Sequence, residues 1–371
     1  MGAQGRGNSH LEFRGYQERR HFANLDGLRF VCISMVLWHH ATPGDLNQIQ
    51  ILSRGFLGVD FFFVLSGFLI TTLLLREARD HGHFSLRDFY MRRALRILPV
   101  YVFVVSAVAF YYVGIKGRSD LADLVPFYYL FLSNFLTDHI PTLSITWSLS
   151  VEEQYYVIWP LLMLLLARRP LVWLALIVVA ANVLGSMGVF GLTAPQIGPL
   201  TLKLPNATYA PIIMGALLAL ALDDPRGHAL AARVLGGRWT AAAGFVLLAL
   251  AIHLTPVEIR GWPNLLIHTL MTATLAALVL REDNTGLGLL RHPLIARIGA
   301  ISYGIYLYHL IALDITNRAL GLAGIAHDWA LLAAYSLLSV LIAEISFRTL
   351  EAWFRRFRPH PRQRHAPAPT A

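Results

Sequence analysis

The sequence contains little charge, almost no lysine and a single cysteine. Only 14% of its 371 residues are charged and 56% are hydrophobic, whereas an ordinary soluble domain carries about 25% charged residues. This shortage of charge argues against a soluble enzyme. The lone Cys32 excludes a disulfide framework and a cysteine-based metal site, so we expect it to be a packing residue and predict no metal site.

The sequence contains many long apolar runs. Many of them are about 17 to 22 residues long, which is the length a helix needs to cross a hydrocarbon layer of roughly 30 Å. The sequence therefore predicts an all-α polytopic membrane protein. The eleven runs fall near 26–42, 56–75, 97–115, 121–137, 151–167, 171–191, 207–222, 239–254, 264–280, 299–317 and 328–347.

The basic residues lie mostly between these runs. The net charge is +9, and 29 of the 31 basic residues are Arg. With a cytoplasmic N-terminus and no crossing at 121–137, the inner segments hold 24 of the 31, as the positive-inside bias requires. We therefore attribute the positive net charge to the orientation of the protein in the membrane, and predict no nucleic-acid partner.

This arrangement predicts about ten transmembrane helices with both termini cytoplasmic. The run 121–137 becomes a re-entrant or interfacial segment, although its aromatic residues fit an ordinary interfacial belt equally well. No cleavable signal is visible, so we expect the first span to serve as its own insertion signal. The predicted divisions are a basic cytoplasmic arm at 1–24, a membrane domain at 25–354 and a disordered, Pro-rich cytoplasmic tail at 355–371.

The first span carries Arg29 and His40, which are costly groups within a membrane. They are eleven residues apart, close to three helical turns, so they share one face and lie about 16 Å apart along the axis. A snorkelling Arg at the inner end and an interfacial His39–His40 pair at the outer end would also explain them.

The second span contains Asp60 near its outer end and a Ser66-Gly67 step further in. Small residues such as Gly67 more often serve close helix packing than catalysis. The predicted topology places Asp60 at the depth of His40. An Asp beside a His fixes the tautomer of the ring and stabilises its protonated form, as a general base requires.

The span that begins near residue 146 carries two acids, Glu152 and Glu153, in its outer half. Capping at Ser148 or Ser150, followed by acids that complement the helix dipole, explains one of them. It does not explain why they cluster at the predicted depth of His40 and Asp60. A His, an Asp and two Glu residues at one depth indicate an acid/base site.

Two further stretches are conspicuous. Arg93 and Arg96, at the cytoplasmic start of the third span, are i and i+3 on one helical face, which suits bidentate binding of phosphate. Lipid headgroups would attract the same residues. The late stretch 301–310 holds several Tyr residues, among them Tyr303, and His309 near mid-span; a polar cavity or an interfacial Tyr belt would account for it.

Taken together, the chain over about residues 20–355 resembles the acyltransferase 3 family of bacterial integral-membrane O-acyltransferases. Four motifs in family order carry the resemblance, together with the Tyr-rich late span. The motifs are Arg-x10-His at Arg29 and His40, Phe-Phe-x-x-Ser-Gly at Phe62 to Gly67, Arg-x-x-Arg at Arg93 and Arg96, and Ser-Leu-x-x-Glu at Ser148 to Glu152. The first motif selects His40 over His39, since only His40 follows Arg29 with ten residues between.

The resemblance implies transfer of an acyl group, usually acetyl, from cytoplasmic acyl-CoA to a hydroxyl of a glycan or glycolipid at the outer side of the bacterial inner membrane. No cofactor would be bound permanently; the expected partners are acyl-CoA, the acceptor and membrane lipid, and a homo-oligomer is left open. Family members often carry a further hydrolase-like domain after the membrane part. This chain ends soon after its last span, so we expect transfer directly to the acceptor or to a separate protein.

For the chemistry we expect His40 to act as the general base, or as a nucleophile that carries the acyl group; the sequence does not choose. Asp60 with Glu152 or Glu153 would orient His40, and Arg29 would pair with an acid or reach the donor. Arg93 and Arg96 would bind the CoA phosphates. Ser66 and Gly67 would let the donor arm pass close to the backbone, and Tyr303, Ser148 and Trp147 are candidates for the oxyanion donor.

A secondary transporter or exporter is the alternative class, since a bundle with buried charges also describes a proton-coupled carrier. The absence of a visible repeat between the two halves argues against it. The identity of the acceptor and the length of the acyl chain are beyond the reach of the sequence.

Overall fold

The fold is taken from a computed structural model that describes residues 12–19, 21–189, 195–201, 209–256 and 258–357. Over these residues the chain consists of helices and their connections, and its paired strands form one very short hairpin. The all-α class predicted from the apolar runs is confirmed. The helices are α1 (Phe13–Glu18), α2 (Asn24–His40), α3 (Gln50–Ser53), α4 (Leu57–His81), α5 (Leu86–Ala109), α6 (Val125–Tyr129), α7 (Thr146–Leu165), α8 (Arg168–Ser186), α9 (Ala210–Asp223), α10 (Pro225–Leu235), α11 (Thr240–Leu254), α12 (Trp262–Leu280), α13 (Pro293–Ala300), α14 (Ser302–Leu322), α15 (Asp328–Arg348) and α16 (Leu350–Arg355), and the hairpin pairs β1 (Gln196–Ile197) with β2 (Leu200–Thr201).

Local signals set several helix boundaries. The Ser85 hydroxyl accepts a hydrogen bond from the backbone N–H of Asp88 and so caps the start of α5. Asp224 caps α10 in the same way, through the N–H groups of Arg226 and Gly227. Gly82 ends α4 at a φ of 78°, a left-handed conformation that glycine adopts without strain.

Within the described residues, five helices are long and apolar enough to cross a membrane: α4, α5 with its continuation to Ile115, α8, α12, and α15 with α16. Two bent pairs raise the number to seven, because α10 meets α11 at 76° and α13 meets α14 at 72°. The protein is thus a multi-helix membrane protein. The predicted total of about ten spans is not confirmed by length and composition alone.

The segment 121–137 is not a long helix. It contains the five-residue α6 between two 3-10 turns at Ser119–Leu124 and Ser133–Phe135. At 1.5 Å per residue, α6 is far too short to cross a bilayer. Its Tyr128 is fully buried; the backbone carbonyl accepts from the Tyr101 hydroxyl, and the side-chain hydroxyl accepts from the N–H of Ile140. Irregular backbone that is buried in protein in this way is tolerated at membrane depth.

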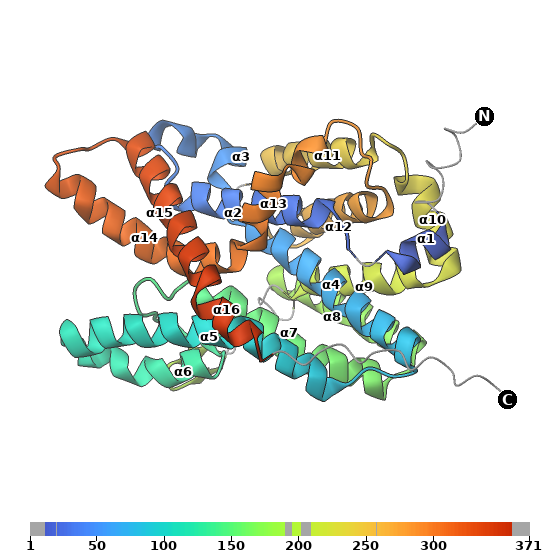
Figure 1. The fold of residues 1–371 in the computed structure, drawn as a ribbon, viewed down its shortest axis with the longest axis horizontal. Helices are drawn as coiled ribbons and strands as arrows, with labels where there is room; N and C mark the ends of the chain where they lie inside the picture. The colour runs from blue at the N-terminus through green and yellow to red at the C-terminus, as the bar shows by residue number, and fades with distance from the viewer. Residues whose placement is uncertain (1–11, 20, 190–194, 202–208, 257, 358–371) are drawn as a thin grey trace.

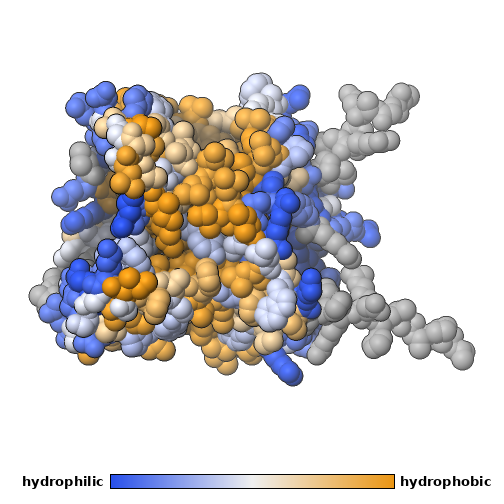
Figure 2. All heavy atoms as spheres, turned by 60° about the vertical axis from the view of Figure 1, so that its left-hand side comes forward, coloured by the Kyte–Doolittle hydropathy of each residue, from blue (hydrophilic) through white to orange (hydrophobic). Residues whose placement is uncertain are grey.

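The surface shows where the bilayer would lie. Figure 2 shows a broad hydrophobic band on the face it draws, with hydrophilic residues gathered on both sides of it. Large apolar side chains remain exposed on the outermost helices, such as Trp173 of α8 (66% exposed) and Leu341 of α15 (50%). A water-soluble protein rarely exposes so much contiguous apolar surface, so these faces are lipid-facing.

The helices that carry the motifs pack closely around α4. Gly55 and Gly58 lie against the backbone of Met35 and Cys32, so that α4 runs back along α2 in the opposite direction. Cys32 is fully buried and free, as expected for a packing residue. In Figure 1, α2 and α4 lie in the middle of the molecule, with α6 toward one end of the long axis and α1 and α10 at the other.

The predicted N-terminal arm is partly structured. Within it, α1 lies beside α10, where Tyr16 is buried and packs on His228 with ring centroids 5.3 Å apart. Arg19 reaches the backbone of Val279 and the carboxylate of Glu282. The predicted tail falls outside the described residues from position 358 onward.

Candidate functional site

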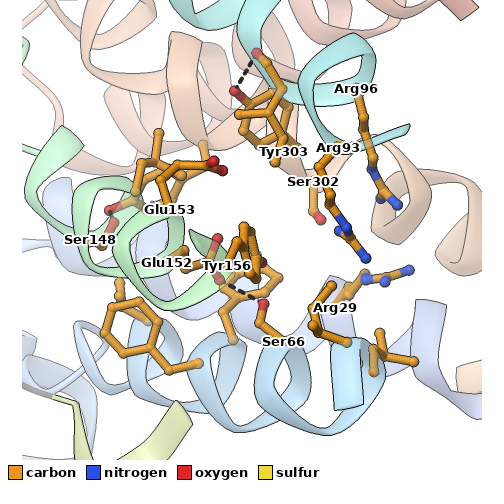
Figure 3. A pocket seen from close by; sticks show the side chains of 18 of the residues that line it. Arg29, Ser66, Arg93, Arg96, Ser148, Glu152, Glu153, Tyr156, Ser302 and Tyr303 are labelled. Carbon is orange, nitrogen blue, oxygen red and sulfur yellow. Dashed lines mark hydrogen bonds between the residues drawn. The ribbon is translucent and has the colours of Figure 1, made fainter. Parts of the chain in front are cut away.

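A cavity of about 220 Å³ lies among α2, α4, α5, α7 and α14, and we call it the inner cavity. It brings together eight of the residues that the sequence singled out. These are Arg29, Ser66, Arg93, Arg96, Ser148, Glu152, Glu153 and Tyr303. Figure 3 shows the guanidinium groups of Arg29, Arg93 and Arg96 converging on one side of it, with the two carboxylates on the facing side.

The basic side of the inner cavity is built by α2 and α5. Arg29 is paired with Asp26 one turn earlier, at 2.6 Å, so its charge is balanced within α2. The expectation that Arg29 pairs with an acid is therefore met by Asp26, not by Asp60 or the two Glu residues. The Arg93 guanidinium lies 5.2 Å from the centre of the Tyr156 ring, a cation–π contact that holds it over the cavity wall.

The acidic side is built by α7, with support from α4. The Ser66 hydroxyl donates to a carboxylate oxygen of Glu152 at 2.6 Å. Glu153 lines the same cavity one residue later. Carboxylates that face guanidinium groups across a narrow space make the inner cavity strongly polar, although apolar residues such as Phe63 and Ile70 line the rest of its wall.

A second cavity, of about 450 Å³, lies further along the same helices; we call it the outer cavity. It is lined by His39, His40, Asp60, His139 and Trp147, among others. The two cavities share Val59 and Tyr306 in their walls. Along α2 the inner cavity is lined by Arg29 and the outer one by His40, as the eleven-residue spacing predicts.

The expected cluster of His40, Asp60, Glu152 and Glu153 at one depth is wrong in part. His40 and Asp60 share the outer cavity, but the two Glu residues lie with the arginines in the inner one. The reason is the start of α7 at Thr146, which places Trp147 in the outer cavity and Glu152 about one and a half turns further in.

Asp60 does not hold His40. Its carboxylate lies 3.0 Å from Nε2 of His268 on α12, and both side chains are buried. His268 was not among the residues singled out from the sequence; it is 208 residues away and is the one titratable side chain of α12. A lone His in an apolar run was its only signal.

Gly67 also differs from expectation. A Cβ at this position would lie 1.8 Å from the carbonyl oxygen of Ile212, and Gly215 approaches Val64 in return. Gly67 therefore serves the close packing of α4 on α9, and it does not line the inner cavity, so it cannot contact a donor arm there. Ser66, its neighbour, does line that cavity.

Of the three residues expected as oxyanion donors, Tyr303 and Ser148 already form hydrogen bonds within the protein. The Tyr303 hydroxyl donates to the carbonyl of Ile97 at 2.9 Å. The Ser148 hydroxyl is 3.1 Å from the carbonyl oxygen of Ile145 and 2.7 Å from the Tyr306 hydroxyl. Trp147 lines the outer cavity instead.

Two tyrosines in the wall of the inner cavity, Tyr156 and Tyr306, were not predicted as site residues from the sequence. Tyr156 stacks under Arg93, and Tyr306 lies in the wall between the two cavities, with its hydroxyl donating to the Ile145 carbonyl at 3.0 Å. Tyr306 belongs to the stretch 301–310, which an interfacial Tyr belt also explained, and Tyr156 was not singled out. Among the described residues, no group of three His, Cys, Asp or Glu side chains is placed to hold a metal ion.

Comparison with known protein families identifies the family of the chain. The family described as "Acyltransferase domain" (Acyl_transf_3) matches residues 22–347. The chain belongs to the acyltransferase 3 family. The resemblance drawn from the four motifs is confirmed, and membership favours acyl transfer over the transporter alternative.

The relatives of the chain are named as O-acetyltransferases. The chain is 27% identical to the peptidoglycan O-acetyltransferase OatA of Listeria monocytogenes over 91% of its own length and 56% of the relative's. It is 28% identical to "Putative peptidoglycan O-acetyltransferase YrhL" of Bacillus subtilis over 90% and 55%. The chain thus spans little more than half the length of these relatives. No solved structure matches the chain.

Proposed function

We propose that this member of the acyltransferase 3 family transfers an acetyl group from acetyl-CoA, in the cytoplasm, to a hydroxyl of a cell-wall glycan at the outer side of the bacterial inner membrane. The observation that carries the proposal is the pair of adjoining cavities. One is lined by three arginines and the other by His40, and they meet at Val59 and Tyr306. The names of the relatives favour a glycan of the peptidoglycan class.

The inner cavity is suited to the donor. Guanidinium groups bind phosphate oxygens bidentately, and Arg93 and Arg96 lie one turn apart on α5. Arg29 is paired with Asp26. We propose Arg93 and Arg96 as the phosphate ligands because they share one face of α5 and both line the cavity. Glu152 and Glu153 are placed across the cavity from them, where their carboxyl oxygens would accept hydrogen bonds from the amide N–H groups of the pantetheine arm.

The outer cavity is suited to the acceptor. It combines the indole of Trp147 with the polar groups of Asp60, Asn264 and Ser144, a set that packs on a sugar ring and binds its hydroxyls. His40 lies in the wall of this cavity at the end of α2. We propose that it is the general base for the acceptor hydroxyl.

The proposed reaction is a direct transfer. His40 takes the proton of the acceptor hydroxyl as its oxygen bonds to the thioester carbonyl carbon. The carbon–sulfur bond then breaks, and the protonated His40 returns the proton to the CoA sulfur. The products are an O-acetyl ester and CoA thiol, and His40 is again neutral.

The membrane arrangement follows the positive-inside bias. We propose ten crossings, by α2, α4, α5, α7, α8, α9, α11, α12, α14 and α15, with both termini in the cytoplasm. The crossings of α2, with 17 residues, and α9, with 14, are short for a full bilayer. Both are packed inside the bundle: Asn182 of α8 accepts from the N–H of Ala210 at the start of α9, and the Tyr335 hydroxyl of α15 donates to the Leu37 carbonyl near the end of α2.

The deciding experiment measures release of CoA and acetylation of purified peptidoglycan fragments by the protein in proteoliposomes supplied with radiolabelled acetyl-CoA. We expect His40→Ala to abolish turnover while acetyl-CoA binding, measured by calorimetry in detergent, stays near the wild-type value. Undiminished turnover in this variant would exclude His40 as the base.

The donor site has a matched control within the same helix. Arg93→Ala and Arg96→Ala should each raise the KM for acetyl-CoA by about tenfold or more, since each removes a charge-assisted contact worth about 1.5–3 kcal/mol. Arg92→Ala should leave KM unchanged, because Arg92 pairs with Glu77 at 2.6 Å and does not line the cavity. Equal KM values in all three variants would contradict phosphate binding at this cluster.

A further inference from the structure

His309 lies against His40 and has no part in the reaction described so far. It sits in α14, fully buried, with its ring centroid 4.8 Å from that of His40 and the two rings tilted by 52°. His40 is the last residue of α2, so the contact joins two helices that are far apart in the sequence. The Tyr-rich stretch around His309 therefore reaches the centre of the candidate site.

The hydrogen bonding of His309 fixes its tautomer. Its Nδ1 lies 2.6 Å from the backbone carbonyl oxygen of Tyr306. A carbonyl oxygen only accepts, so Nδ1 carries the hydrogen, and in the neutral ring Nε2 is left with a free lone pair. This Nε2 is buried and has no hydrogen-bond partner among the described residues. Buried acceptors are seldom left in that state, so Nε2 indicates a donor that arrives during function.

Geometry makes His40 the donor. Two imidazoles joined by one N–H···N bond have ring centres about 5 Å apart, and the two rings already lie 4.8 Å apart. The other titratable side chains around His40 in the outer cavity are His39, Asp60, His139 and Tyr306, and the Tyr306 hydroxyl already donates to the Ile145 carbonyl. Asp60 is occupied by His268, and His39 places its Nδ1 against the carbonyl of Ser53 at 3.2 Å.

We propose that His309 is a positioning residue for His40: its Nε2 accepts the N–H of His40, so that the other nitrogen of His40 faces the acceptor hydroxyl. The proton stays on His40 until it passes to the CoA sulfur, and His309 remains neutral throughout. His309 thus holds the tautomer of the base, which the sequence had assigned to Asp60. The proposal rests on the proposed function for the role of His40 as base.

Two substitutions separate positioning from packing. His309→Leu keeps a buried apolar side chain and removes the acceptor, whereas His309→Gln returns an oxygen near the Nε2 position. In the proteoliposome assay with acetyl-CoA and peptidoglycan fragments, we expect His309→Leu to lower kcat by about tenfold or more with KM for acetyl-CoA unchanged. His309→Gln should recover a large part of the loss.

A neighbouring residue of α14 supplies the matched control. The Tyr308 hydroxyl donates to Ser346 on α15 at 3.0 Å, away from both cavities. Tyr308→Phe removes one buried hydrogen bond from the same helix, so it should lower Tm slightly and leave kcat unchanged. If His309→Leu retains the wild-type kcat, or if His309→Gln is as slow as His309→Leu, His309 is a packing residue and the proposal is wrong.

A measurement without turnover keeps this test independent of the proposed function. Diethyl pyrocarbonate carbethoxylates the free nitrogen of a neutral histidine, and mass spectrometry of the α2 peptide gives the rate at His40. We expect a severalfold lower rate in His309→Leu and recovery in His309→Gln. Equal rates in the three proteins overturn the proposal. A wild-type protein that transfers no acetyl group while these rates differ contradicts the proposed function and supports the histidine pair.

Discussion

The hydrogen bond from Ser66 to Glu152 holds one carboxylate of the inner cavity in place. It is 2.6 Å long and joins α4 to α7. We expect Ser66→Ala and Glu152→Gln each to raise the KM for acetyl-CoA by about tenfold, which corresponds to the loss of one hydrogen bond to a charged group. In the double variant the loss should be no larger than in either single variant, because the two side chains act as one unit.

Steady-state kinetics on the four proteins of this double-mutant cycle would measure the coupling. Ser106→Ala is the control, since Ser106 is an exposed residue of α5 whose hydroxyl meets Tyr129. Effects of Ser66→Ala and Glu152→Gln that simply add would show that Ser66 does not position Glu152.

Single residues were predicted best where the signal was local. The spacing of Arg29 and His40 and that of Arg93 and Arg96 fixed which side chains share a helix face, and both pairs line the cavities as expected. Hydrogen-bond and ion-pair partners that come from another helix could not be predicted. Nothing near Asp60 in the chain indicates that His268 would take its carboxylate, because the contact depends on how α4 packs on α12.

The packing of α4 on α9 depends on two glycines that face each other's backbone. A Cβ on Gly67 would overlap the carbonyl oxygen of Ile212, and one on Gly215 would overlap that of Val64. We expect Gly67→Ala to cost about 1–3 kcal/mol of stability, since the two helix backbones must separate to admit it. Thermal unfolding and the folded fraction on size-exclusion chromatography would measure the loss.

Gly321 offers the opposite case on α14. It is exposed, and a Cβ there would meet nothing within 4 Å. Gly321→Ala should therefore leave Tm unchanged or raise it slightly, as alanine favours the helix. If both variants behaved alike, the close approach of α4 and α9 would not contribute to stability.

The helices themselves were largely predictable, and their bends were not. Every apolar run except 121–137 contains a helix of at least 14 residues close to the predicted range, because burial and lipid contact both select continuous apolar sequence. No local pattern indicated that α10 would turn by 76° into α11, or α13 by 72° into α14. α10 carries two Arg and a His, and α13 is only eight residues long; the direction of both depends on tertiary contacts.

The direction in which the whole bundle crosses the membrane follows from charge, and the single cysteine makes it measurable. Cys32 is fully buried within the bundle, so a membrane-impermeant maleimide should not label the wild-type protein in intact cells. New cysteines at exposed positions then report their own side. Asp45, between α2 and α4, is predicted outside, and Arg169, at the start of α8, inside.

We expect Asp45→Cys to be labelled in intact cells and Arg169→Cys only after the membrane is opened. The physical reason is the cost of moving the Arg-rich connections to the outer side, which the bias in Lys and Arg reflects. The same pattern would put the Arg93 and Arg96 side of the inner cavity toward cytoplasmic CoA and His40 toward an outer acceptor. If only Arg169→Cys were labelled in intact cells, the bundle would have the opposite orientation, and cytoplasmic CoA could not reach the arginines from the predicted side.

Labelling of both positions in intact cells would require an even number of membrane crossings between residues 45 and 169. That result is incompatible with the three proposed crossings in this interval, by α4, α5 and α7.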